Sequence, residues 1–154
     1  MRALLTISQS MEVRMTPIIT FYLSRVIGVK VLDINENNIG IVKDLLIDPD
    51  PSNHVVGRPF VKSIKIKCKK QIAFYSFQDF QIKKVDGKIK INCNQLIELS
   101  PDNINYDLYL ADAVLDKQIA DLNGHKLVRV NDIRLVSIID DVIENLINKR
   151  RTNK

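Results

Sequence analysis

The chain has 154 residues, of which 45% are hydrophobic and 27% charged, and its formal net charge is +5. This composition is typical of a globular protein, and no stretch approaches the roughly 18 consecutive apolar residues that a membrane-spanning helix needs. Met1–Ser10 holds only a short apolar run, which is too brief for a secretory leader. We therefore expect a cytoplasmic protein without membrane insertion, in which Cys68 and Cys93 remain structural thiols.

The N-terminal part of the chain divides into an arm and a hairpin. Residues 1–20 show no clear period, so we expect a mobile N-terminal arm. From Phe21 the pattern becomes that of strands. Val29 and Val31 lead through an asparagine-rich turn into a strand over 39–47, where Gly40 predicts a bulge or a close backbone approach.

Short strands dominate the middle of the chain. The turn signal Asp86-Gly87 predicts a type I′ hairpin, and Phe77–Phe80 predicts a short turn or helical step. Lysines at 65, 67 and 69 alternate with apolar residues, which is typical of the solvent face of a strand; a phosphate-binding stripe is the alternative. The predicted strands are 61–69, 72–75, 82–85 and 89–93.

A second hairpin follows near the C-terminal end. Ile119–Leu122 leads into Asn123-Gly124, the strongest turn signal in the chain, and the pattern returns over 126–135. Its apolar residues change face across Asn131-Asp132, which predicts a bulge there and at the corresponding Lys43-Asp44.

The two hairpins belong to a repeat. Val26–Asp48 matches Val114–Val136 without a gap at a constant offset of 88 residues (114 minus 26), and five of the 23 positions are identical. Six further positions are apolar in both copies, so the burial pattern repeats together with the residues. The identical pairs are Val26/Val114, Asp33/Asp121, Asn35/Asn123, Val42/Val130 and Asp44/Asp132.

After Val136 the period changes to that of an amphipathic helix. Ser137 suits an N-cap, and Lys149–Arg151 complement the C-terminal dipole. The apolar stripe of this helix requires cover from the rest of the chain, from a second copy or from a following domain. Its members are Ile138, Ile139, Val142, Ile143, Leu146 and Ile147.

Motifs that carry catalysis are absent from the sequence. His54 and His125 lie in predicted turns, and no nucleophile elbow, phosphate loop or zinc-hydrolase signature is found. Asp48 and Asp50 lack the further oxygen ligands of a calcium loop. We therefore expect no catalytic residues, no cofactor and no metal site. Asp33 and its repeat Asp121 are expected to cap the hairpin turns.

The hairpin motifs resemble the PRC-barrel family. Its opening hairpin pattern is matched by Gly28, Val31, Asp33, Gly40, Val42 and Asp44. The second copy resembles, more specifically, the second barrel of the PRC-barrel pair at the cytoplasmic N-terminus of some MgtE-type magnesium transporters. That signature is matched by Leu115, Asp116, Lys117, Gln118, Asp121, Gly124, Val128, Arg129, Val130, Asn131 and Asp132.

The resemblance implies a mainly β fold of two tandem small PRC-type β-barrels with a C-terminal amphipathic helix. The implied domains are residues 21–99 and a shorter 100–136, followed by a helix and basic tail over 137–154. It implies a non-catalytic cytoplasmic interaction or regulatory module. Its partner would be a protein, either a transporter cytoplasmic domain, which would hold the chain at the cytoplasmic face of the membrane, or a second copy.

The candidate interaction surface lies around the two predicted bulges. Equal weight goes to a structural alternative, in which the same residues cap the hairpins through local salt bridges. The rival function is RNA or ribosome binding of the RimM type, which the positive charge alone supports. The candidate residues are Lys43, Asp44, Arg129, Asn131, Asp132 and Arg134.

Overall fold

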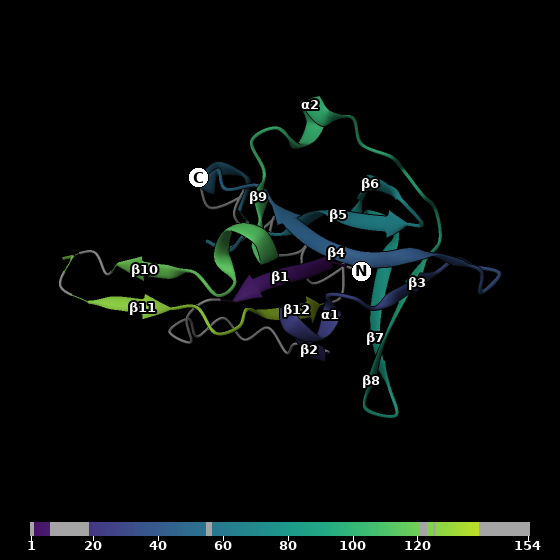
Figure 1. Cartoon of the computed structure of the whole chain (residues 1–154), viewed down its shortest axis with the longest axis horizontal. Helices are drawn as coiled ribbons and strands as arrows, with labels where there is room; N and C mark the ends of the chain where they lie inside the picture. The colour runs from purple at the N-terminus through teal and green to yellow at the C-terminus, as the bar shows by residue number, and fades with distance from the viewer. Residues whose placement is uncertain (1, 7–18, 55–56, 121–122, 125, 139–154) are drawn as a thin grey trace, which may run out of the picture.

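The computed structural model describes residues 2–6, 19–54, 57–120, 123–124 and 126–138. Most of its elements are strands, which confirms the predicted mainly β class (Figure 1). Within these ranges, no helix has both the length and the apolar character to cross a bilayer. The strands are β1 (Arg2–Thr6), β2 (Ile19–Tyr22), β3 (Lys30–Leu32), β4 (Asn38–Ile47), β5 (Val61–Cys68), β6 (Gln71–Ser76), β7 (Phe80–Val85), β8 (Lys88–Cys93), β9 (Leu108–Tyr109), β10 (Gln118–Ala120), β11 (Leu127–Arg129) and β12 (Arg134–Ile138).

Five short helical turns connect these strands. Two are α-helical, two are 3₁₀ turns and one is a five-residue π-helical turn. They are α1 (Leu23–Val26), η1 (Pro51–Asn53), η2 (Phe77–Asp79), α2 (Pro101–Ile104) and the π-helical η3 (Leu110–Val114). The predicted helical step after Tyr75 is confirmed by η2.

The largest sheet runs in the order β6-β5-β4-β3-β8-β7, with β9 added to the end of β4 (Figure 1). Along β5, Ile64 and Ile66 are buried whereas Lys65 and Lys67 are only half-buried, which follows the alternation in the sequence. At the β7–β8 turn, Asp86 and Gly87 both have positive φ, 52° and 76°, which confirms the type I′ hairpin.

Gly40 permits the close packing of β4 on β5. Its φ is +137°, and a Cβ there would lie 2.5 Å from Ile66 Cγ2 and 2.7 Å from the Lys67 carbonyl oxygen. Only glycine fits this position without displacing the neighbouring strand. The predicted close backbone approach is therefore confirmed.

The start of the chain differs from the predicted mobile arm. β1 pairs antiparallel with β12 over five residue pairs, from Arg2 opposite Ile138 to Thr6 opposite Arg134. β2 pairs with the other edge of β12. The RALLT segment has no strict alternation, so the sequence pattern alone did not reveal that β12 offers it an edge. The rest of the predicted arm, 7–18, lies outside the described residues.

The predicted C-terminal helix does not begin at Ser137. Ser137 is buried in β12, where it pairs with Ala3 on one side and Ile19 on the other. Strands on both edges supply backbone partners, so sheet pairing prevails over the helical period at this position. The remainder of the predicted helix, 139–154, lies outside the described residues.

The two repeats interlock through exchanged strand pairing. β9, which precedes the second repeat, pairs with β4 of the first, with Leu46 opposite Tyr109. β2, which precedes the first repeat, pairs with β12 of the second, with Arg134 opposite Tyr22. The two strand pairs occupy equivalent positions of the repeat. Arg134 lies 88 residues after Leu46, and Tyr109 lies 87 residues after Tyr22. The offset changes by one because η3 has five residues where α1 has four.

One hydrophobic cluster therefore draws on both repeats. Val31 and Val42 from the first share it with Ile133 and Leu135 from the second and with Leu110 of η3. The predicted division into domains 21–99 and 100–136 crosses this cluster and both exchanged strand pairs, so the described residues do not form two separate cores.

Candidate interaction surface

At the first predicted bulge, Lys43 and Asp44, which were both predicted to belong to the interaction surface, have different environments. Val42 pairs with Ile66 and Asp44 with Lys65, so Lys43 has no partner on β5 and the predicted bulge is confirmed. Lys43 is exposed, whereas only 3% of Asp44 is exposed. The prediction that Asp44 belongs to the surface is wrong, because the backbone of η3 packs over its carboxylate.

Asp44 instead caps the helical turn of the other repeat. Its carboxylate accepts hydrogen bonds from the backbone N–H groups of Leu45 at 2.7 Å, Ala111 at 2.7 Å and Asp112 at 3.0 Å. Burial raises the pKa of this carboxyl group, although the three N–H donors and Lys65 oppose the shift. A carboxylate at the start of η3 satisfies donors that the turn itself leaves unpaired.

Asp132, from the second repeat, likewise caps the helical turn α1 that leads into the first repeat. Its Oδ1 accepts from the backbone N–H of Ser24 at 3.2 Å and of Ile133 at 2.8 Å, and its Oδ2 accepts from the Ser24 hydroxyl. Partial burial raises its pKa, but the bonds from Ser24 and Ile133, together with Arg25, outweigh burial and leave the pKa below its usual value. Each repeat thus caps the helical turn of the other.

The backbone around each turn also repeats. Gly28 N–H donates to the Val42 carbonyl at 2.8 Å, and Asp116 N–H donates to the Val130 carbonyl at 2.8 Å. These two bonds are related by the 88-residue offset. The repeat identified in the sequence is therefore a repeat of hydrogen bonding, and it supersedes capping by local salt bridges as the structural role of Asp44 and Asp132.

The other predicted surface residues lie along the second repeat. Arg129 and Asn131 are exposed and Arg134 is half-buried. Arg129 contacts Asp116 at 3.4 Å, with both side chains largely exposed. A surface ion pair of this kind contributes little to stability. The predicted bulge at Asn131-Asp132 is a longer interruption, because residues 130–133 separate β11 from β12.

A feature missed in the sequence is the exposure of the β10–β11 hairpin. Among the described strands, β10 and β11 pair only with each other, and they project from the molecule (Figure 1). Ile119 is 51% exposed and its equivalent Val31 is fully buried; Leu127 is 69% exposed where Ile39 is half-buried. The sequence carries the same apolar pattern in both copies and gave no signal of this difference.

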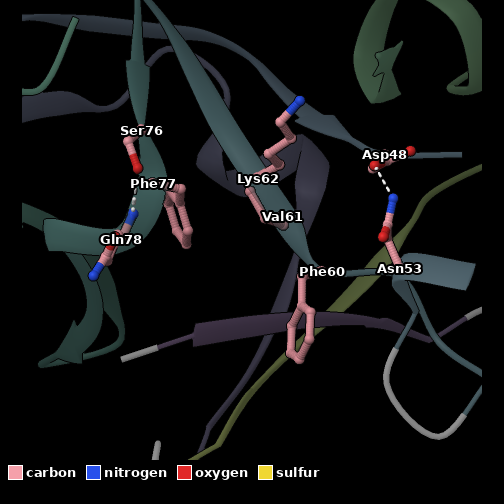
Figure 2. A pocket seen from close by; sticks show the side chains of 8 residues that line it. All are labelled: Asp48, Asn53, Phe60, Val61, Lys62, Ser76, Phe77 and Gln78. Atoms are coloured by element: carbon pink, nitrogen blue, oxygen red, sulfur yellow. Dashed lines mark hydrogen bonds between the residues drawn. The ribbon is translucent and has the colours of Figure 1, made fainter. Parts of the chain in front are cut away.

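A cavity of about 320 Å³ lies beside β5 and η2 (Figure 2). Figure 2 shows the Lys62 side chain pointing away from Phe60. The Lys62 ammonium group donates to the Asn103 carbonyl at 2.8 Å and to Asp107 at 3.0 Å. The lining residues are Asp48, Asn53, Phe60, Val61, Lys62, Ser76, Phe77 and Gln78.

Metal-binding clusters of three or more histidine, cysteine or acidic side chains do not occur in the described ranges. Asp33 caps its hairpin turn as predicted, accepting from the N–H groups of Asn35 and Asn37, both at 2.8 Å. Its repeat Asp121 lies outside the described residues.

Comparison with protein-family models, with curated proteins and with solved structures found no significant match for this chain. The conclusions on function therefore rest on its own residues.

Proposed function

We propose that this chain is a non-catalytic protein-interaction or regulatory module of the PRC-barrel type, acting in the cytoplasm on a partner such as the cytoplasmic part of an MgtE-type transporter. The observation that carries this proposal is the projecting β10–β11 hairpin with its exposed Ile119, Leu127 and Val128. Exposed apolar side chains grouped on one element are typical of surfaces that bind another protein.

The first repeat supports strand addition as the mode of binding. Its equivalent hairpin is extended by β8, which pairs parallel with β3 and places Ile91 beside Val31. In the second repeat, β10 stands in the place of β3 and has no such neighbour among the described strands. A partner strand running parallel to β10 would cover Ile119 as β8 covers Val31, with backbone hydrogen bonds providing affinity.

The polar and charged residues near the interruption between β11 and β12 support selectivity for a partner rather than affinity. Arg129 is the last residue of β11, Asn131 and Arg134 follow it, and all three would meet the rim of a docked partner. Rim charges mainly set the association rate and the choice of partner. Asp44 and Asp132 hold this region in place through their caps.

The test is calorimetric titration of the chain with the helical cytoplasmic domain of an MgtE-type transporter. Ile119→Lys places a charge on the contact face and is expected to weaken binding about tenfold or more. The control is Ile72→Lys on β6, because Ile72 is 52% exposed and Ile119 is 51% exposed. The control variant is expected to bind as the unaltered chain does.

A second pair of variants addresses the rim. Arg129→Glu with Arg134→Glu is expected to slow association while leaving the free energy of unfolding within about 1 kcal/mol of its original value, because the Arg129 ion pair is exposed. Lost stability with unchanged binding would contradict the proposal, and so would equal weakening by Ile119→Lys and Ile72→Lys or failure of the unaltered chain to bind.

A further inference from the structure

The strands of the large sheet carry nine lysines and a single acidic residue. That acid is Asp44, which is buried. A solvated sheet face normally mixes both signs of charge, so this imbalance differs from an ordinary polar surface. The lysines are Lys30, Lys43, Lys62, Lys65, Lys67, Lys83, Lys84, Lys88 and Lys90.

Four of these lysines form one row across the sheet. Lys67 of β5 pairs with Ile41 of β4, which pairs with Lys30 of β3. Val31 of β3 pairs with Ile91 of β8 in the parallel ladder, so the residues that precede them, Lys30 and Lys90, lie on neighbouring strands at the same level. Lys90 in turn pairs with Lys83 of β7.

The row lies on the outer face of the sheet. Val31 and Ile91, the neighbours of Lys30 and Lys90, are buried, and successive side chains along a strand point to opposite faces. Lys30, Lys83 and Lys90 are exposed, and Lys67 is half-buried. At a strand spacing of about 4.8 Å, the four intervals from β5 to β7 span roughly 19 Å.

Two structural explanations do not account for this row. Lysines often protect the open edges of sheets, but Lys30 and Lys90 lie on the interior strands β3 and β8. Stability does not favour the row either, because Lys83 and Lys90 are directly opposite and like charges in that position repel. Lys65 differs from the row, since its ammonium group lies 5.9 Å from the Phe74 ring centre and 5.7 Å from that of Tyr109.

We propose that the row Lys67, Lys30, Lys90 and Lys83 binds the phosphate backbone of single-stranded nucleic acid. A narrow line of cations suits a linear array of phosphates, and the exposed lysines of the row can contact a strand that lies along it. The row offers only ammonium groups, which contact phosphates and do not read base edges, so binding is independent of base sequence. This site lies on a different sheet from the β10–β11 hairpin and does not depend on the proposed protein interaction.

The experiment measures binding of the full chain to a fluorescein-labelled oligouridylate of about 12 nucleotides by anisotropy, over a series of salt concentrations. Each phosphate contact with a single strand contributes about −0.7 to the slope of log affinity against log salt, so four lysines predict a slope near −2.8. Lys30→Gln with Lys90→Gln is expected to reduce the magnitude of the slope by about 1.4.

The matched control is Lys117→Gln with Lys126→Gln, which removes two exposed charges from outside the large sheet. This control is expected to keep the slope of the unaltered chain. Because Lys83 and Lys90 repel one another, Lys90→Gln alone is expected to preserve or raise the melting temperature, which separates lost binding from lost folding.

Three outcomes would overturn the inference. The first is absence of binding at low salt, and the second is an equal loss of slope in the control variant. The third is binding to vesicles containing phosphatidylserine that depends on Lys30 and Lys90 while the oligonucleotide fails to bind, since this would assign the row to a membrane surface.

Discussion

At the scale of single residues, Asp44 and Asp132 both cap helical turns but are expected to contribute unequally to the free energy of unfolding. Asp44 is buried and satisfies three backbone N–H groups, so Asp44→Ala is expected to lower the free energy of unfolding by about 3 kcal/mol. Asp132 is half-exposed, and Asp132→Ala is expected to cost about 1 kcal/mol, as for an ordinary N-cap. Urea unfolding of both variants measures the difference, and a larger loss for Asp132→Ala would contradict this assignment.

The same two aspartates predict opposite dependences of stability on pH. Burial raises the pKa of Asp44 above 3.8, so between 3.8 and its folded pKa the folded state binds more protons and stability falls as pH rises. For Asp132, burial is outweighed by hydrogen bonds and the folded pKa lies below 3.8, so its stabilising contribution is lost as pH falls through that value.

Unfolding of Asp44→Asn and Asp132→Asn, compared with the unaltered chain from pH 3 to pH 6, checks these signs. Relative to Asp44→Asn, the unaltered chain is expected to lose stability as pH rises. Relative to Asp132→Asn, it is expected to lose stability as pH falls. The same sign for both aspartates would show that their environments are not those described.

Some of these residues could be identified from the sequence and others could not. The turn at Asp86-Gly87 follows from local residue preferences, and the bulge at Lys43 follows from the change of apolar phase at the equivalent position of the second copy. The 88-residue offset showed that Asp44 and Asp132 are equivalent. It could not show that each caps the other repeat, because a repeat specifies which segments are alike and not which of them pair.

At the scale of elements, β1 has the place on β12 that β5 has on β4. Both run antiparallel along the outer edge of the long strand of a repeat, opposite the exchanged strand. The third strand of the second repeat thus comes from the start of the chain. The sequence did not reveal this, because β1 precedes both repeats, whereas β5 is the next strand after β4 along the chain.

The pairing of β1 leads to a prediction for a chain that starts at Met11. Such a chain lacks β1, so five residues of β12 lose their partners along one edge. Its free energy of unfolding is expected to fall by at least about 2 kcal/mol. Thermal unfolding of the two forms measures the loss, and an unchanged melting temperature would mean that β1 contributes nothing to the fold.

At the scale of the whole molecule, the exchanged strands and reciprocal caps join the repeats into one folding unit. β4 cannot lose β9 without exposing the core that Leu110, Ile133 and Leu135 share with Val31. The resemblance implied two tandem small barrels, whereas buried residues from both repeats belong to one hydrophobic cluster. Within this single unit, hairpins with similar sequences have different environments: one lies within the large sheet and the other projects from the molecule.

This interlocked unit is tested most directly by urea unfolding followed at individual residues by NMR. One set of probes lies in the first repeat, at Val31 and Val42, and the other lies at Leu135 in the second repeat and at Leu110 in the helical turn η3 that leads into it. We predict coincident transitions for all four residues, shifted together to lower urea by Asp44→Ala. Two separate transitions, with Asp44→Ala moving only one of them, would contradict the account.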